Sequence, residues 1–184
     1  MENFVLLKLV LMLIFLLFII ALLFYYIAMV LSIFRNAPYV GTRRAVARGA
    51  MKLANVKENE KVVDLGSGTG NLLFVAAEEG ALATGYELSF VLNFLARLRQ
   101  KLFYPKFKIE IIRKNFFQAY LKDADVVVCY LLSETMGKLC DKFEKELQPC
   151  TRIVSISFKI PNWEPIKSIR IKNHDLYLYE IGKT

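Results

Sequence analysis

The chain changes character near residue 34, where a long apolar run gives way to mixed apolar and polar positions. No charged residue stands between Leu9 and Phe34. A helix of about 26 residues rises about 39 Å, which exceeds the roughly 30 Å hydrocarbon layer of a bilayer. The pattern therefore predicts a transmembrane helix over residues 4–34. The alternatives are a cleaved signal peptide and a buried core helix, but the run is far longer than a signal-peptide core and no small-residue cleavage site clearly follows it.

Beyond the apolar run, strand-like and helix-like stretches alternate. The expected strands are Lys61–Leu65, Ala83–Glu87, Lys108–Arg113, Ala124–Leu131 and Arg152–Phe158. The expected helices are Arg43–Ala54, which Thr42 can cap, Gly70–Glu79, Phe90–Leu102 and Glu134–Leu147. β-Branched runs such as Val126–Val128 are typical of central strands that helices cover on both faces. The alternation predicts an α/β fold with a Rossmann-like, doubly wound, mostly parallel sheet.

The end of the chain breaks this alternation. Two strands are expected at Ser168–Lys172 and Leu176–Ile181, separated by Asn173, His174 and Asp175. So short a connection predicts an antiparallel hairpin at one edge of the sheet. We therefore divide the chain into a transmembrane helix (4–34), a juxtamembrane linker with a pre-domain helix (35–55) and one α/β domain (56–184).

The positive charge of the chain is concentrated after the apolar run. The formal net charge is +8, and basic residues gather just beyond the run at Arg35, Arg43, Arg44, Arg48 and Lys52. The positive-inside rule then places the α/β domain in the cytoplasm, and this cluster is suited to anionic lipid headgroups. Nucleic acid is a weaker explanation, because the other basic residues are scattered among acidic ones.

Cysteine and histidine offer little support for metal or nucleophilic chemistry. Cys129, Cys140 and Cys150 lack metal-ligand spacing, and we expect buried free thiols in a reducing compartment. His174 is the only histidine, and no second ligand type stands at a useful spacing. We therefore expect no metal site and no serine–histidine catalysis.

A glycine-rich segment follows the first predicted strand of the domain. It reads Asp64-Leu65-Gly66-Ser67-Gly68-Thr69-Gly70, and a predicted helix comes next. This is the carboxyl end of a strand, where open α/β sheets bind ligands, and glycine lets a ligand approach the backbone. A plain tight turn is the alternative interpretation, so the segment has to be judged with its surroundings.

The second predicted strand ends in Glu87, and this residue indicates which class of ligand the glycine-rich segment binds. A carboxylate at this place can accept hydrogen bonds from both ribose hydroxyls, which indicates a nucleoside ligand. The glycine spacing is GxGxG rather than the GxGxxG that serves a pyrophosphate. S-adenosylmethionine is a nucleoside without phosphate, and Asp64 can serve its methionine ammonium directly or by orienting the loop.

These two segments resemble the motifs of the class I S-adenosylmethionine-dependent methyltransferases. More narrowly, the chain is similar to the family that includes the lysine methyltransferases of the ATP synthase c-subunit and of the adenine nucleotide translocase, with short prokaryotic relatives. The similarity covers an N-terminal apolar helix, the Pro38-Tyr39-Val40 step, Tyr86-Glu87-Leu88, Tyr130-Leu131 and a closing Phe158-Lys159-Ile160-Pro161-Asn162-Trp163-Glu164-Pro165.

The resemblance implies a cofactor and a set of residues that hold it. The cofactor is S-adenosylmethionine, and the implied binding residues are Asp64, Gly66, Ser67, Gly68, Gly70, Glu87, Leu88, Asn115 and Phe116. Asn115 and Phe116 form the implied adenine edge, where an asparagine amide can both donate and accept; a plain turn residue is the other interpretation of Asn115.

The substrate side is less defined. Tyr130 is placed to line a pocket at the end of the fourth strand, with Tyr39 and Trp163 as further candidates, and aromatic packing is the alternative for all three. Two departures bear on this side: Gly41 and Ser133 stand where the family commonly has proline. The substrate-side loops are therefore expected to differ from those of the family.

The leading functional hypothesis is N-methylation of a lysine in a membrane protein. A methyltransferase for a lipid or quinone-like molecule and a catalytically silent cofactor-binding module are the alternatives. A base-amino nucleic-acid methyltransferase is disfavoured, because the place of its Asn/Asp-Pro-Pro-aromatic run reads Cys129-Tyr130-Leu131-Leu132. Since the first eight residues contain no arginine or serine, a prokaryotic plasma membrane is favoured over the mitochondrial inner membrane.

Overall fold

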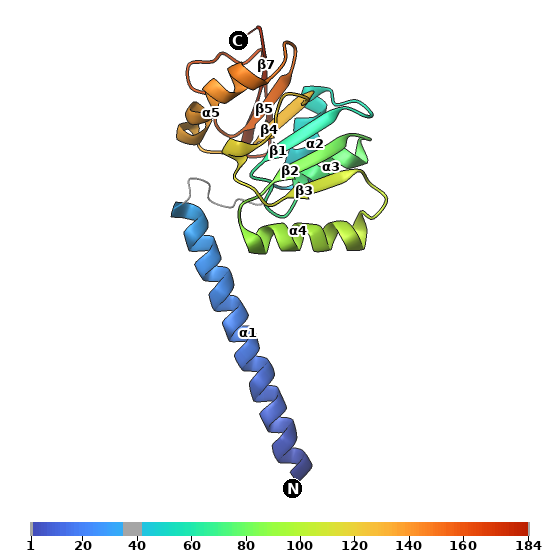
Figure 1. The fold of residues 1–184 in the computed structure, drawn as a ribbon, viewed down its shortest axis with the longest axis vertical. Helices are drawn as coiled ribbons and strands as arrows, with labels where there is room; N and C mark the ends of the chain where they lie inside the picture. Colours follow the sequence, from blue (N-terminus) through green and yellow to red (C-terminus); the bar gives the residue numbers. More distant parts are fainter. Residues whose placement is uncertain (1, 35–41, 184) are drawn as a thin grey trace. The chain divides into compact units, whose positions relative to one another are not determined.

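The computed structural model describes residues 2–34 and 42–183, and it divides the chain into two units, 1–38 and 39–184. The first unit holds one uninterrupted helix, α1 (Glu2–Phe34), and the second is an α/β domain (Figure 1). Within α1, residues Leu6–Met29 are long and apolar enough to cross a membrane, and none of this stretch is buried in the protein. Apolar side chains that no protein covers are suited to lipid.

The domain is built on one mixed sheet (Figure 1). Its strands are β1 (Lys61–Leu65), β2 (Leu82–Tyr86), β3 (Ile109–Ile112), β4 (Val126–Cys129), β5 (Arg152–Ile156), β6 (Lys167–Ile171) and β7 (His174–Glu180), in the order β3-β2-β1-β4-β5-β7-β6. The first five strands are parallel, and β7 lies antiparallel between β5 and β6. The predicted Rossmann-like sheet with a C-terminal antiparallel hairpin is confirmed.

Helices cover both faces of the sheet. The helices are α2 (Arg44–Ala54), α3 (Asn71–Glu78), α4 (Phe90–Phe103) and α5 (Ser133–Glu146), and a short 3-10 turn, η1 (Phe116–Gln118), connects β3 to β4. Residues of α2, α3 and α4 share one buried cluster with Val62, Val126 and Val154 of the sheet. Neighbouring strand residues point to the other face, where the buried side of α5, including Leu139 and Phe143, completes the core.

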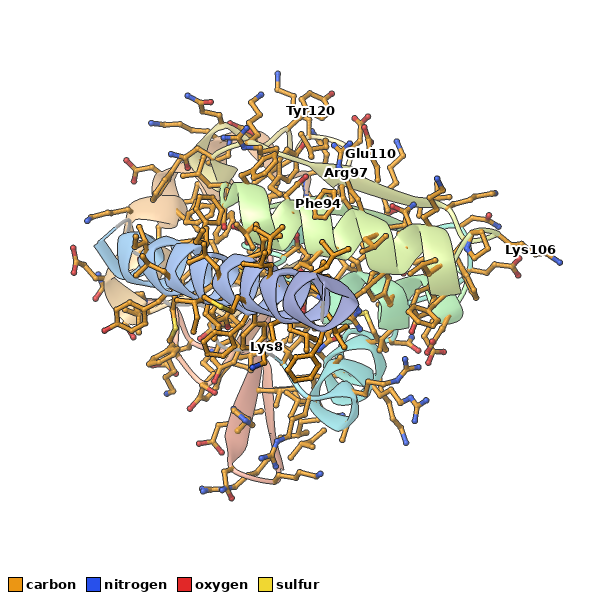
Figure 2. All side chains as sticks on the ribbon, turned by 90° about the horizontal axis from the view of Figure 1, so that it is seen from below. Lys8, Phe94, Arg97, Lys106, Glu110 and Tyr120 are labelled. Atoms are coloured by element: carbon orange, nitrogen blue, oxygen red, sulfur yellow. The ribbon has the colours of Figure 1, made fainter. Side chains whose placement is uncertain are left out.

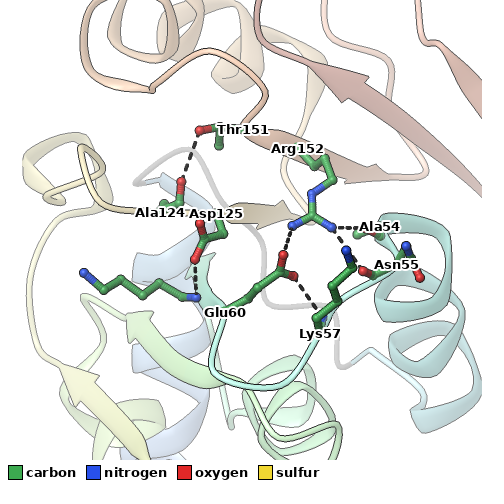
Figure 3. Close-up of polar contacts among 9 residues, drawn as sticks. Ala54, Asn55, Lys57, Glu60, Ala124, Asp125, Thr151 and Arg152 are labelled. Atoms are coloured by element: carbon green, nitrogen blue, oxygen red, sulfur yellow. Dashed lines mark hydrogen bonds and ion pairs between the residues drawn. The ribbon is translucent and has the colours of Figure 1, made fainter.

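Helix α2 is part of the domain core rather than a free spacer. Its buried side includes Val46, Ala50 and Met51. At its end, the Arg152 guanidinium of β5 donates to the carbonyls of Ala54 and Asn55 and pairs with Glu60 at 2.6 Å (Figure 3). These bonds cap the carboxyl end of α2 and fasten it to the amino end of β5.

Three local predictions are wrong. Thr42 does not cap α2: Arg43 is the N-cap and no side-chain bond caps the helix. The hairpin turn is shorter than expected, because His174 and Asp175 already belong to β7 and Lys172 adopts a left-handed φ of 54° beside Asn173. Among the cysteines only Cys129 is buried, since Cys140 is half-buried and Cys150 is exposed; all are free thiols.

Candidate functional site

The parallel strands β1 to β5 end at one edge of the sheet, and the predicted site residues gather there. The glycine loop follows β1, Glu87 follows β2, Asn115 lies beyond β3, and Tyr130 follows β4. Because β1 lies between β2 and β4 in the sheet order, the glycine loop stands between Glu87 and Tyr130. Sequence positions far apart are thus brought to the place where open α/β sheets bind ligands.

The glycine loop has a backbone shape that requires its glycines. Gly66, Gly68 and Gly70 have φ values of 84°, 55° and 87°. These values lie in the left-handed region, which other residues enter only at a cost. The N–H groups of Gly66 and Ser67 donate to the Tyr86 carbonyl at 2.9 and 3.1 Å, so the loop turns back toward the end of β2.

Glu87 fastens this loop to the neighbouring strand. Its Oε2 accepts a hydrogen bond from the Gly68 N–H at 2.9 Å, and its Oε1 accepts one from the Ser89 N–H at 2.7 Å. Burial raises the pKa of Glu87, and the backbone donors of Ser89, Gly68 and Leu88 partly offset that rise. A half-buried carboxylate with a fixed direction therefore stands beside the loop, and Leu88 is half-buried next to it.

Asp64 lies beneath the loop and is buried, with 2% of its surface exposed. Its Oδ2 and the Oγ of Ser67 are buried with no hydrogen-bond partner among the described residues. Burial, and after it the charge of Glu87, raises the pKa of Asp64 to about 8. Unpaired buried polar atoms cost free energy, so this pair of atoms marks a place suited to a polar ligand.

Arg99 of α4 holds the loop from the other side, a contact that the sequence analysis missed. Its guanidinium donates to the Thr69 carbonyl at 2.7 Å and to Asn71 Oδ1 at 2.9 Å. The Asn71 amide in turn donates to the Thr42 carbonyl at 2.7 Å. No local sequence signal could have indicated Arg99, because the contact depends on how α4 packs against the loop.

The predicted adenine edge is present beyond β3. The Asn115 Oδ1 accepts a hydrogen bond from the Phe117 N–H at 3.0 Å, so this side chain caps the turn η1. Phe116 is buried, and its ring lies 4.8 Å from that of half-buried Phe117. Asn115 therefore acts as a turn residue through its side-chain oxygen. Its contact with the adenine of the cofactor stays a prediction.

Tyr130 stands in a polar cluster that the sequence did not indicate. Its hydroxyl lies 3.3 Å from His174 Nδ1, and Ser157 Oγ lies 2.9 Å from the same nitrogen. Ser157, just beyond β5, has a left-handed φ of 66°, a conformation that is typically retained only where its surroundings enforce it. His174 and Ser157 were missed because the antiparallel pairing of β7 with β5 brings them together.

The remaining residues predicted for the substrate side are Trp163, Tyr39, Gly41 and Ser133. Trp163 packs between Phe143 of α5 and Tyr179 of β7, with ring centroids 6.4 and 6.2 Å away. These contacts account for Trp163 as a packing residue, and its place in a substrate pocket stays a prediction. Tyr39 and Gly41 lie outside the described residues. Ser133 is the exposed first residue of α5.

The geometry fits the cofactor expected from the sequence. S-adenosylmethionine carries an ammonium and a sulfonium, and two carboxyls with raised pKa values, Asp64 and Glu87, lie at the loop. A cation favours the charged form of such groups, whereas a pyrophosphate would oppose it. At Gly66 an added Cβ would meet only Leu131, at 3.4 Å, whereas at Gly70 it would meet the Phe74 ring at 2.9 Å. Within residues 2–34 and 42–183, no cluster of three His, Cys, Asp or Glu residues could hold a metal ion.

Comparison with known proteins points the same way. A family profile described as the ANTKMT methyltransferase domain matches residues 64–167. A protein-lysine N-methyltransferase of Saccharolobus islandicus is 34% identical over 156 residues, which cover 80% of this chain and 96% of that protein. The adenine nucleotide translocase lysine N-methyltransferase of Mus musculus is 30% identical over 147 residues; the match covers 79% of this chain and 64% of the longer mouse protein.

A solved structure shares the fold at the same level of identity. It is described as an RNA methyltransferase from Salinibacter ruber in complex with S-adenosyl-L-homocysteine. It is 30% identical, has a TM-score of 0.74, and the match covers 79% of this chain and 95% of that one. S-adenosyl-L-homocysteine is the product that remains after S-adenosylmethionine gives up its methyl group.

Proposed function

Because the chain belongs to the family of the ANTKMT methyltransferase domain, we propose that it is a membrane-anchored methyltransferase that transfers a methyl group from S-adenosylmethionine to a lysine of a membrane protein. The observation that carries the cofactor assignment is the bond between Glu87 and Gly68, which sets a carboxylate beside the glycine loop. The proposed binding residues are Asp64, Gly66, Ser67, Gly68, Gly70, Glu87, Leu88, Asn115 and Phe116.

Each side of the cofactor site has a distinct proposed task. Glu87 keeps acceptor lone pairs for the ribose hydroxyls while its N–H contacts fix its direction. Asp64 supplies a carboxyl oxygen without a protein partner near the positive end of the cofactor. Arg99 keeps the loop in place by binding the Thr69 carbonyl. When bound, S-adenosylmethionine supplies an electrophilic methyl carbon on a positively charged sulfur.

The acceptor side must orient a neutral amine. The lysine ammonium first gives a proton to water. The amine nitrogen then forms a bond to the methyl carbon while the bond from carbon to sulfur breaks and its electron pair stays on sulfur. The lysine pKa is about 10.4 in water, and an apolar or cationic surround lowers it and so favours the neutral form. We assign the hydroxyl of Tyr130 to accept a hydrogen bond from the amine, with His174 and Ser157 as positioning residues that hold this hydroxyl.

The anchor completes the proposal. Residues 4–34 are proposed as a membrane span, and 35–55 as the linker with the pre-domain helix α2, which packs into the core of the methyltransferase domain at 56–184. The basic cluster beyond the span supports a cytoplasmic domain. The absence of arginine and serine from the first eight residues supports a prokaryotic plasma membrane over the mitochondrial inner membrane. Confinement to the bilayer raises the effective concentration of membrane substrates.

The test is transfer of label from S-adenosylmethionine with a tritiated methyl group. Full-length chain is incubated with membranes of its host, and the products are separated into protein, lipid and RNA. The proposal expects label in protein, and expects a chain without residues 1–34 to keep cofactor binding while labelling membranes more slowly. Cofactor binding should not depend on the anchor, because the domain has its own core.

Each other outcome selects another function. Label in the lipid fraction would replace the lysine by a lipid or quinone-like acceptor. Label in RNA would bring the chain toward the activity named for the Salinibacter ruber protein. Cofactor binding without any transfer would identify a silent cofactor-binding module. Equal rates for the full and shortened chains would mean that the helix does not serve substrate encounter.

A further inference from the structure

Helix α4 carries an apolar stripe that no other part of the described chain covers. Its buried side consists of Leu92, Asn93 and Ala96, which face the domain. Its outer side presents Phe90, Phe94, Leu98, Leu102 and Phe103, which are 57, 56, 42, 62 and 70% exposed. The first four recur every fourth residue, so they form one line along the helix of about 18 Å. A run of large apolar side chains on one surface helix marks an interaction surface.

Within its own segment of the chain, the stripe is accompanied by positive charge alone. The segment 90–108 contains no acidic residue, and its basic residues are Arg97, Arg99, Lys101, Lys106 and Lys108. Arg99 is directed to the glycine loop, and the other four are exposed. Figure 2 views this side of the domain, with Phe94, Arg97 and Lys106 labelled; Glu110 of β3 is the acidic residue labelled near Arg97.

We infer that α4 is an interfacial helix that lays its apolar stripe into the headgroup region of an anionic bilayer. An apolar face with lysine and arginine alongside is the composition of helices that lie in the membrane interface. A second copy of the chain is a poorer partner, because a two-fold contact would set the same basic residues against each other. The inference rests on the proposed membrane anchor, which keeps the domain near a bilayer.

Docking through α4 would also fix the height of the site above the bilayer. The helix starts at Ser89, its N-cap, whose N–H donates to Glu87. Farther along, Arg99 holds the glycine loop through the Thr69 carbonyl at 2.7 Å. These contacts join the cofactor loop to α4. A site held at a set distance from the headgroups selects acceptor groups that lie close to the membrane surface.

The depth of α4 is measured with a single tryptophan in the full-length chain. Trp163 is the sole tryptophan, and Trp163→Phe keeps an aromatic ring against Phe143 and Tyr179. In this background Phe94→Trp reports on the stripe, and Ile166→Trp reports on an exposed apolar residue outside it. Both variants are reconstituted into phosphatidylcholine vesicles with or without phosphatidylglycerol, using lipids brominated near the top of the acyl chains.

The inference expects a blue shift and strong quenching of the tryptophan at 94 in anionic vesicles, and little quenching at 166. Quenching at 94 should fall in high salt and in Lys101→Gln/Lys106→Gln, because screening or removing charge weakens attraction to the headgroups. Equal quenching at both positions would overturn the inference. So would full quenching in vesicles without phosphatidylglycerol, since the basic residues would then have no part.

Flotation of the vesicles shows whether the chain is anchored in the membrane, independently of whether α4 docks on it. If the chain floats and resists carbonate extraction but the tryptophan at 94 is not quenched, the anchor stands and the docking of α4 is overturned. If that tryptophan becomes shielded only when a membrane protein is added, the stripe binds protein instead. If the chain does not float, both the anchor and the docking fail, although methyl transfer in solution can still be measured.

Discussion

Glu87 and Gly68 are joined by a hydrogen bond of 2.9 Å in which the glycine N–H donates to the carboxylate. The bond gives the side chain of Glu87 a part in shaping the loop, beside its proposed part in binding the ribose of the cofactor. Glu87→Ala should therefore weaken binding of S-adenosylmethionine by about 1 to 3 kcal/mol, through loss of charge-assisted hydrogen bonds. Calorimetry on the full-length chain in detergent measures this difference.

Glu110→Ala is the matched control for that substitution. Glu110 lies on the neighbouring strand β3 and is exposed, so its removal should leave the affinity unchanged. Wild-type affinity in Glu87→Ala would remove Glu87 from the site, and equal losses in both variants would point to a general effect of negative charge.

Gly85 tests how closely the loop packs on β2. A Cβ at this position would lie 2.4 Å from Leu73 Cδ1 and 2.8 Å from both Cβ and Oγ of Ser67. Gly85→Ala should push Ser67 and the loop outward, at about 1 to 3 kcal/mol of unfolding free energy, and lower cofactor affinity as well. Denaturant unfolding and calorimetry follow the two effects.

Gly137→Ala provides the opposite expectation at a glycine without crowding. A Cβ there would be 3.6 Å from Pro161, in ordinary contact, and the residue lies inside α5. Alanine in a helix interior should stabilise the chain by about 0.5 to 1 kcal/mol. An equal stability loss in both variants would contradict the packing described for Gly85.

The buried carboxyl of Asp64 predicts a pH dependence of stability. Its pKa is raised to about 8 in the folded chain, from 3.8 when unperturbed. Between these values the unfolded chain has lost the proton and the folded chain keeps it, so unfolding releases a proton. The contribution of Asp64 is complete below pH 3.8 and falls as pH rises to about 8, by at most about 1.4 kcal/mol per pH unit.

Asp64→Asn isolates this contribution, because the amide does not titrate. The stability difference between wild type and variant should change steadily from about pH 5 to about pH 8, with the variant relatively more stable at high pH. Denaturant unfolding at several pH values measures it. A difference that does not vary with pH would mean that Asp64 is ionised in the folded chain throughout this range.

Much of the fold was accessible from the sequence because it depends on local patterns. Strand β1 has the predicted bounds, Lys61–Leu65, since Val62 and Val63 favour a strand and Gly66 directly follows Leu65. The hairpin was placed correctly but its turn was set too long, because a left-handed Lys172 leaves no mark in the hydrophobic pattern. Thr42 fits the composition of a helix cap, yet α2 begins at Arg44 with Arg43 as its N-cap.

Some residues of the candidate site could be predicted from local patterns, and others could not. The glycine loop and Glu87 could be predicted because each follows its own strand, and the parallel order brings strand ends together. The contact between Tyr130 and His174 could not, because it requires the pairing of Ile156 with Leu176 across β5 and β7. Contacts between elements that are distant in sequence depend on register, which composition does not specify.

Tyr130 and its histidine neighbour predict a loss of turnover without a loss of binding. Tyr130→Phe removes the hydroxyl that is proposed to orient the amine, so the rate of methyl transfer should fall by about 10-fold or more at unchanged cofactor affinity. His174→Phe should give a smaller loss, because it removes only the Nδ1 atom that lies 3.3 Å from that hydroxyl. Single-turnover transfer and calorimetry separate the two quantities.

Tyr120→Phe is the control for the loss of a tyrosine hydroxyl. Tyr120 is exposed, and its hydroxyl contacts Asp123 rather than the site. Full activity in Tyr120→Phe with reduced activity in Tyr130→Phe would support the assignment. Full activity in Tyr130→Phe would assign that ring to packing, together with Phe158 and His174.

Methylation of a lysine in a membrane protein can be detected by mass spectrometry of the host's membrane proteins. Membranes from cells with the wild-type chain are compared with membranes from cells with Gly68→Val, in which a branched side chain obstructs the loop at a φ of 55°. We expect a methylated lysine in a membrane protein that is present with the wild-type chain and absent with the variant. Membrane proteins with identical lysine methylation in the two cultures would contradict it.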